Sequence, residues 1–439
     1  MHADHGGARE DSHMPETIAL ISEHASPLAA LGGVDSGGQN VYVGQLANHL
    51  TALGYGVDVF TRRDCETLPE SVRLPSGARV IHVRSGPPRY VAKEDLLPLM
   101  DDFGERMLRY CRRCGGYDLV HANFWTSGMV ALRMKERLGT PFVVTFHALG
   151  RVRTLHQAEQ DRFPTMRPAL EERIIAGAER VIAECPQDRH DLVQLYGASP
   201  DSIATIPCGF DETEFWPLDK RYARRILHLH PDEPILLQLG RIVPRKGIET
   251  AIRSLACLAE RHGIRARLLV VGGQSSSPDP VLTPEIGRLR AIAETAGVGD
   301  QVIFTGSRER DVLRHYYSAA DIFITTPWYE PFGITPLEAM ACARPVIGSR
   351  VGGIKSTVVD GQTGFLVPPR DPAAVADRAA ELLCDRQRTD AFGAAGWRRA
   401  KEHFTWPHVA ARIAELYREV RRESPRQQPL WSGKSVSMP

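Results

Sequence analysis

The chain has 439 residues, of which 43% are hydrophobic and 24% charged, with a formal net charge of +1. This length is too great for one core and predicts two domains of ordinary size. The near-neutral charge argues against a nucleic-acid-binding protein, and no apolar run reaches the roughly 18 residues that a membrane-spanning helix needs.

The termini and the cysteines carry no predicted function. Residues 1–15 are polar without an apolar signal core, and residues 423–439 are rich in Pro, Arg, Gln and Ser, so we expect both to be disordered. Cys111 and Cys114 form a lone Cys-x-x-Cys without a second pair or a histidine at zinc spacing. We therefore expect a cytoplasmic protein with reduced thiols, no metal site and no cofactor.

The first half of the chain alternates short apolar runs with segments of helical spacing. Strands are predicted at residues 17–22, 56–60, 79–83, 118–121, 142–146, 180–183 and 203–206. This alternation predicts a doubly wound parallel sheet, and we assign it to a first domain at residues 16–215.

The same pattern restarts after a polar segment at residues 216–230, which we interpret as a linker. Strands are predicted at residues 234–239, 266–271, 301–304, 321–326 and 345–348. The fold class is α/β, with a second Rossmann-like domain at residues 231–405 facing the first across a cleft. An amphipathic helix at residues 406–422 is expected to cross back to the first domain.

The stretch from Glu330 to Glu338 is the most informative one in the second domain. Proline and glycine break the chain after a predicted strand, and Thr335 and Pro336 are predicted as the N-cap and first residue of a helix. A helix N-terminus suits a phosphate group, and two glutamates lie on either side of it. The alternative is a solvated glutamate at each position.

Two cations, Arg241 and Lys246, come directly after a strand and at the start of a helix. Because cations there oppose the helix dipole, a bound anion such as a diphosphate explains them better than two surface side chains do.

Two further features lie in the first domain. The glycine loop at residues 32–40 would let backbone approach a ligand, although a flexible turn has the same composition. His147 is predicted at the end of a strand, where either a structural or a catalytic role is open.

These residues resemble the retaining glycosyltransferases of the GT-B fold (glycosyl transferases group 1), which include sucrose-phosphate synthase, sucrose synthase and inositol-phosphate glycosyltransferases. The second-domain signatures are Glu330–Glu338 and Gly240–Gly247. The first-domain segments Asp35–Tyr42 and Phe146–Arg151 are similar to those of the sucrose-type members. The resemblance extends over about residues 17–420.

The resemblance implies a role for each site residue. The catalytic set is His147, Glu330, Arg241 and Lys246. The groups implied for the nucleotide-sugar donor are Arg241 and Lys246 on the diphosphate, Glu330 on the hexose, Glu338 on the ribose, the main chain of Phe332, Gly333, Ile334 and Thr335, and Gly37 and Gly38 of the facing domain. Transfer with retention, without a metal, is implied as well.

The sequence identifies the acceptor less closely than it identifies the donor. Gln39, Lys93, Arg151, Arg153 and Arg167 are predicted to bind a small sugar or polyol, with a phosphate on it as one alternative. Where the inositol-phosphate enzymes have Tyr and Thr on the acceptor side, this chain has Phe124 and Ala148.

We therefore predict a hexosyltransferase that uses a nucleotide sugar, with a UDP-sugar favoured and uridine near Ser307 and Arg308. The alternatives on the same fold are a nucleotide-sugar epimerase and a non-catalytic nucleotide-sugar-binding protein. The base, sugar, linkage, acceptor and oligomeric state are open at this point.

Overall fold

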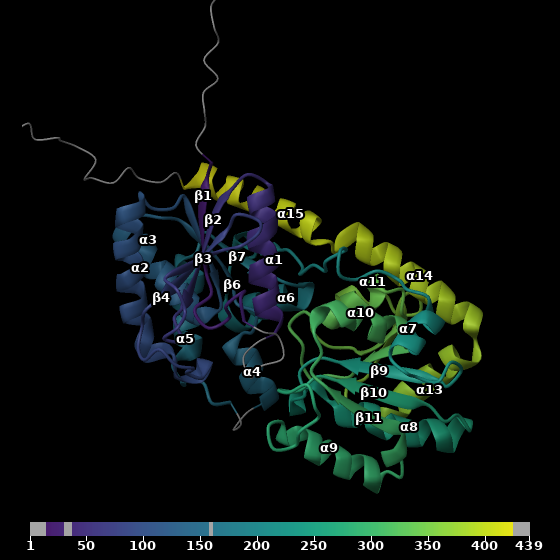
Figure 1. Cartoon of the computed structure of the whole chain (residues 1–439). Helices are drawn as coiled ribbons and strands as arrows, with labels where there is room; N and C mark the ends of the chain where they lie inside the picture. The colour runs from purple at the N-terminus through teal and green to yellow at the C-terminus, as the bar shows by residue number, and fades with distance from the viewer. Residues whose placement is uncertain (1–14, 30–36, 158–160, 425–439) are drawn as a thin grey trace, which may run out of the picture.

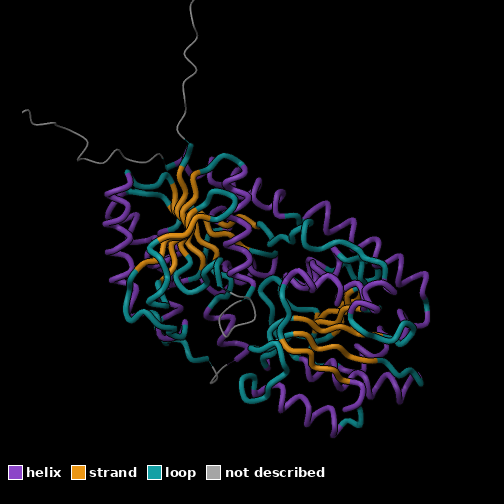
Figure 2. The backbone as a smooth tube through the Cα atoms, viewed as in Figure 1, coloured by secondary structure: helices purple, strands orange, loops and turns teal. Residues whose placement is uncertain are grey.

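The computed structural model describes residues 15–29, 37–157 and 161–424. They form two α/β domains, each built on its own sheet, which confirms the predicted fold class (Figures 1 and 2). The predicted lead-in up to residue 14, residues 30–36 (which include residues 32–36 of the glycine loop), residues 158–160 and residues 425–439 of the predicted tail lie outside the described residues.

The first sheet has eight strands among these residues, in the order β3-β4-β2-β1-β5-β6-β7-β8. Neighbouring strands are parallel except β3 and β4, which are antiparallel. The strands are β1 (Thr17–Ile21), β2 (Gly56–Arg62), β3 (Ser71–Arg73), β4 (Arg79–Val83), β5 (Leu119–Asn123), β6 (Phe142–Thr145), β7 (Arg180–Ala183) and β8 (Ile203–Thr205).

The second sheet, within the same described ranges, has six parallel strands in the order β11-β10-β9-β12-β13-β14. They are β9 (Ile235–Leu239), β10 (Arg267–Val271), β11 (Val302–Gly306), β12 (Ile322–Thr325), β13 (Val346–Ser349) and β14 (Gly364–Val367). Of all fourteen strands, the sequence patterns did not predict β3 and β14.

The helices surround the two sheets (Figure 2). Those that follow strands of the first sheet are α1 (Gly38–Ala52), α2 (Met100–Cys114), α3 (Trp125–Leu138), α4 (Gly150–Gln157), α5 (Arg167–Gly177) and α6 (Pro186–Tyr196). Those of the second half are α7 (Lys220–Ile226), α8 (Ile248–His262), α9 (Pro284–Thr295), α10 (Arg310–Ala319), α11 (Ile334–Ala341), α12 (Ile354–Thr357), α13 (Pro372–Cys384), α14 (Arg386–His403) and α15 (Trp406–Glu423).

Each sheet reverses its strand order at one place, and these two places position the site. In the first sheet the reversal lies between β1 and β5, and in the second between β9 and β12. A crevice opens at the carboxyl ends of strands that diverge in this way. His24 follows β1, Arg241 follows β9 and Trp328 follows β12, and all three line one cavity.

The segment at residues 216–230 is more than a linker. It contains α7, which packs on α10 of the second domain. Arg224 of α7 is buried and donates to the carbonyls of Ala319 and Pro231 and to Asp321. These bonds attach the segment to the second domain.

The last two helices extend over different domains (Figure 1). α14 packs on α11 and α13 of the second domain, whereas α15 packs on α1 of the first. Arg421 of α15 forms ion pairs with Glu16 and Asp118, which flank strands of the first sheet.

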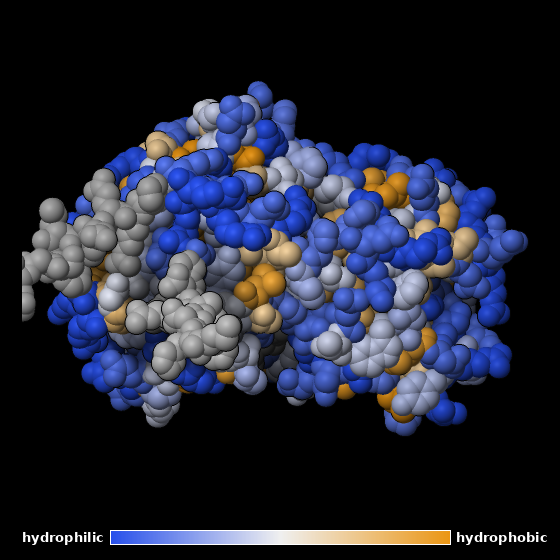
Figure 3. Space-filling model, turned by 90° about the horizontal axis from the view of Figure 1, so that it is seen from above, coloured by the Kyte–Doolittle hydropathy of each residue, from blue (hydrophilic) through white to orange (hydrophobic). Residues whose placement is uncertain are grey.

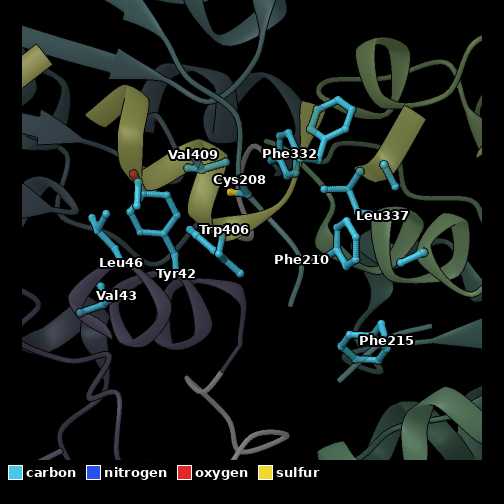
Figure 4. Packing of buried hydrophobic residues seen from close by; sticks show 14 of the residues in the cluster. Tyr42, Val43, Leu46, Cys208, Phe210, Phe215, Phe332, Leu337, Trp406 and Val409 are labelled. Atoms are coloured by element: carbon cyan, nitrogen blue, oxygen red, sulfur yellow. The ribbon is translucent and has the colours of Figure 1, made fainter. Parts of the chain in front are cut away.

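One hydrophobic cluster joins the domains (Figure 4). Tyr42 of α1 packs edge to face on Trp406, with ring centroids 5.5 Å apart. Phe332 and Leu337 of the second domain belong to the same buried cluster. Burial of this apolar surface stabilises the mutual position of the two domains and so the shape of the crevice.

The face seen from above in Figure 3 is mostly hydrophilic where the described residues are visible, with small separate apolar patches. Within the described residues, no helix combines the length and the apolar character that crossing a bilayer requires.

His121 should stay neutral far below the usual range for histidine. Its ring is fully buried, with Nδ1 2.7 Å from the Tyr417 hydroxyl of α15 and Nε2 2.9 Å from Thr145 Oγ1. Burial, together with nearby His147, lowers its pKa to about 3. The unfolded chain takes up a proton near pH 6.5 and the folded chain does not, so each pH unit below 6.5 should cost about 1.4 kcal/mol of stability.

NMR of ¹³C-labelled histidine rings should show one signal that does not titrate between pH 8 and 5 and that disappears in His121→Gln. Titration of that signal within this range would contradict the expectation.

Candidate active site

A cavity of about 510 Å³ lies at the seam between the two domains. Its lining comes from both, including Gly38 and His147 of the first domain and Arg241, Lys246 and Glu330 of the second. The residues that the sequence singled out in separate segments therefore meet in one place.

One wall of the cavity carries an excess of positive charge. After β9 the chain presents Arg241, and a 3-10 turn at Pro244–Lys246 presents Arg245 and Lys246. Lys246 forms an ion pair with Glu330, and Arg245 Nη1 lies 3.7 Å from the same carboxylate. Arg245 and Lys246 thus share one carboxylate, and Arg241 lies near enough to act on the same pair, which favours an additional anion here.

The pKa values of Lys246 and Glu330 reflect the same excess of positive charge. Burial lowers the pKa of Lys246, and Arg245 and Arg241 act in the same direction against the attraction of Glu330. Burial by itself would raise the pKa of Glu330, but Lys246 and Arg245 hold it below its usual value. A diphosphate next to Lys246 would oppose the repulsion from the arginines.

The start of α11 differs from the prediction. The N-cap is Gly333, with φ of 92°, rather than Thr335, and the helix begins at Ile334. A glycine adopts this positive φ without the steric cost that a Cβ adds, so the chain turns into the helix two residues earlier than the Thr-Pro pair indicated. The loop that precedes α11 is also fixed by a backbone hydrogen bond, in which Gly353 N donates to the Glu330 carbonyl at 3.2 Å.

Glu338 lies one turn into α11, buried and oriented by two partners. The Tyr317 hydroxyl donates to Oε2 at 2.7 Å, and Arg310 Nη1 lies 3.2 Å from Oε1. Each carboxylate oxygen retains a further lone pair, so Glu338 can still accept bonds from ligand hydroxyls. The sequence did not predict Arg310 or Tyr317, which come from another helix.

The opposite wall is the start of α1. A Cβ on Gly37 would lie 3.4 Å from Arg241 Cδ, and one on Gly38 would lie 3.4 Å from Ile334 Cδ1. The lack of side chains lets this backbone approach the second domain closely. Gln39 follows and donates to Ser22 Oγ and to the Asn123 carbonyl.

His147 follows β6 in a left-handed conformation with φ of 56°. Its Nδ1 lies 3.1 Å from Glu184 Oε1, and its Nε2 lies 3.1 Å from Asn123 Oδ1. Burial would raise the pKa of Glu184, but His147 and Cys208 hold it below its usual value. Glu184 directly follows β7, and a carboxylate at a strand end is a signal that the sequence reading could have used.

The predicted acceptor residues separate into two groups. Gln39, Lys93 and Arg153 line the cavity. Arg151 and Arg167 are not among the described residues of its lining, and their predicted role stays a prediction. Arg151 instead bonds to the Leu195 carbonyl. Arg167 is buried against Phe124.

The cysteines show no sign of a metal or redox centre in the part of the chain that the structure describes. Cys111 and Cys114 both lie on α2, and no group of three or more His, Cys, Asp or Glu side chains there could hold an ion. All eight cysteines are free thiols.

Family models match nearly the whole described chain. The "Glycosyltransferase Family 4" model matches residues 36–214, and the "Glycosyl transferases group 1" model matches residues 219–399. The chain is 38% identical to D-inositol 3-phosphate glycosyltransferase 2 of Catenulispora acidiphila, over 92% of this chain and 95% of the relative.

Solved structures show the same architecture. Sucrose-phosphate synthase from Thermosynechococcus elongatus superimposes with a TM-score of 0.86 at 35% identity, covering 93% of this chain and 100% of that one. Anabaena HepE in complex with UDP-glucose gives a TM-score of 0.71 at 20% identity, over 92% of this chain and 99% of that one.

Proposed function

Because the chain belongs to the group 1 glycosyltransferases with the GT-B fold, we propose that it moves a hexosyl group from a nucleotide sugar to a hydroxyl of a small sugar or polyol. The observation that carries this proposal is the cluster of Arg241, Arg245 and Lys246 on one wall of the cavity, where Arg245 and Lys246 share the Glu330 carboxylate. It supplies the charge that a diphosphate leaving group requires.

In this proposal the donor extends along the second-domain wall. Arg241 and Lys246 hold the diphosphate and neutralise the charge that develops as the sugar–phosphate bond breaks. Glu330 accepts bonds from hexose hydroxyls, and Glu338 accepts them from the ribose. Main-chain N–H groups of Phe332 to Thr335 hold the hexose and phosphate oxygens. These protein cations make a metal ion unnecessary for the transfer.

The facing wall completes the reaction centre. Gly37 and Gly38 bring backbone toward the phosphate, and His147, held by Glu184 and Asn123, lies beside the sugar. The acceptor oxygen forms its bond to the anomeric carbon on the face that the diphosphate leaves. The configuration is therefore retained, and the departing phosphate takes the acceptor's proton. Family resemblance supports this part of the proposal.

A donor-by-acceptor matrix tests the function. UDP-, ADP- and GDP-sugars are incubated with free and phosphorylated sugars and polyols, and products are identified by mass spectrometry. We expect a glycosylated acceptor and release of a nucleoside diphosphate, with UDP-sugars as the best donors. Binding of donors without transfer or hydrolysis would contradict the proposal.

The relatives are glycosyltransferases by name, and neither alternative is favoured. An epimerised nucleotide sugar as the only product would identify an epimerase instead.

A further inference from the structure

In the proposed function, the cavity has a donor end at Arg245 and Lys246 and an acceptor end at Lys93 and Arg153. The two ends differ in how their charged side chains are paired. At the donor end, Arg245 and Lys246 share the carboxylate of Glu330. At the acceptor end, every basic residue that the sequence nominated has a carboxylate of its own, as the four ion pairs below show. This difference bears on which acceptor the site can take.

Two of these pairs lie at the cavity. Lys93 Nζ is 3.2 Å from Glu94 Oε1, and both residues are part of the lining. Arg153 Nη2 is 3.2 Å from Asp161 Oδ1 and 3.1 Å from Gln157 Oε1. The four charged side chains of these two pairs are only 11–19% exposed, so water screens the pairs less than it would on an open surface.

The other two cations also have carboxylate partners. Arg167 Nε donates to Glu171 at 2.7 Å, and its guanidinium lies 4.4 Å from the centroid of the Phe163 ring. Arg151 pairs with Glu172 and is not among the described lining residues. Residues 30–36 and 158–160, outside the described ranges, contain no lysine or arginine in their sequence.

The remaining lining at this end suits hydroxyl groups. Gln39 and Gln157 offer neutral amides, and Glu94 offers a carboxylate that accepts hydrogen bonds. Phe124 and Phe163 add apolar ring surface. Pockets for uncharged ligands commonly combine apolar walls with a few polar groups of this kind.

We propose that the acceptor is an uncharged polyol or glycoside that carries no phosphate group. The inference rests on the proposed function, since it concerns the acceptor of that reaction. A phosphate that binds Lys93 would lie beside the Glu94 carboxylate, which already shares this cation. Such like-charge contact is unfavourable, and it discriminates against a phosphorylated acceptor.

Calorimetry on the full chain saturated with UDP tests the inference, because UDP occupies the diphosphate site and leaves the acceptor end open. Matched probes are myo-inositol and inositol 3-phosphate, and glucose and glucose 6-phosphate. We expect the phosphorylated member of each pair to bind no tighter than the neutral one. Binding of a phosphorylated member about ten-fold tighter, equal to about 1.4 kcal/mol, would overturn the proposal.

Charge-neutralising variants provide a second test, in which a gain of affinity for phosphorylated probes is expected. The double variant Glu94→Gln and Asp161→Asn removes both carboxylates, and we expect it to bind the phosphorylated probes about ten-fold more tightly than the wild type does. Glu172→Gln is the matched control, because it neutralises the partner of Arg151 away from the cavity, and it should gain nothing.

A double variant that gains no affinity, or a control that gains as much, would refute the assignment. Failure of the wild type to bind UDP or turn over any donor would instead refute the proposed function.

Discussion

Replacing Lys246 with alanine is expected to lower kcat by about 10²–10³-fold, the range measured when one preorganised charge-stabilising group is removed from an active site. Lys246 is largely buried beside Glu330, and in the proposed mechanism its charge acts on the leaving diphosphate. Arg241 and Arg245 remain in the variant, so donor binding should weaken less than turnover does. Initial rates over a range of donor concentrations separate the two effects.

Arg253→Ala is the matched control for this variant. Arg253 is a cation on the surface of α8 that pairs with Glu249 at 3.0 Å and lies outside the cavity lining. Its removal should leave kcat within about two-fold, because exposed ion pairs contribute little. Glu330 keeps Arg245 at 3.7 Å in the Lys246 variant, so circular dichroism should show a folded protein. A Lys246→Ala enzyme with near-normal kcat would remove this residue from the mechanism.

Replacing Gly247 with alanine is expected to destabilise the second domain by about 4 kcal/mol, at the severe end for a single substitution. Gly247 is the N-cap of α8, with φ of 62°. A Cβ there would lie 2.0 Å from the backbone oxygen of Thr326, a residue that also donates its hydroxyl to the Gly247 carbonyl. Because the atoms that this Cβ would clash with belong to the backbone of Thr326, the clash can be relieved only by moving the loop that carries Lys246 or the end of β12.

Gly263→Ala separates this clash from the strain of a positive φ. Gly263 caps the other end of α8 with φ of 67°, and a Cβ there would meet nothing within 4 Å. It should cost only about 1–2 kcal/mol, the penalty of the left-handed conformation. Thermal unfolding should show a fall in Tm of about 10 °C for the Gly247 variant and a few degrees for the control. Equal losses would show that the contact with Thr326 can relax.

Local patterns were sufficient for the fold. Most strands lie within a few residues of their predicted places, because the spacing of apolar residues indicates which side of a strand is buried. The short edge strand β3 and the strand β14 were missed. The cap of α11 was misplaced because a positive φ at Gly333 is a matter of backbone conformation, which the Thr-Pro pair at 335–336 does not determine.

Some of the site's pairings could have been read from the sequence. Arg167 and Glu171 are four residues apart on α5, which is the spacing of a helical ion pair. Lys93 and Glu94 are adjacent in the chain. Applied in advance, these spacings would have argued against Arg167 as a phosphate ligand.

The sequence by itself determined two α/β domains with a crevice at the ends of their strands, and it predicted an anion site near Arg241, Lys246 and Glu330. These depend on periodicity, strand ends and charge, which are local properties. Only the tertiary structure decided which groups meet: Lys246 and Glu330 are 84 residues apart, and His147 and Glu184 are 37 apart. Such contacts depend on how strands are ordered in the sheets and how the domains face each other, and no short stretch of chain contains that information.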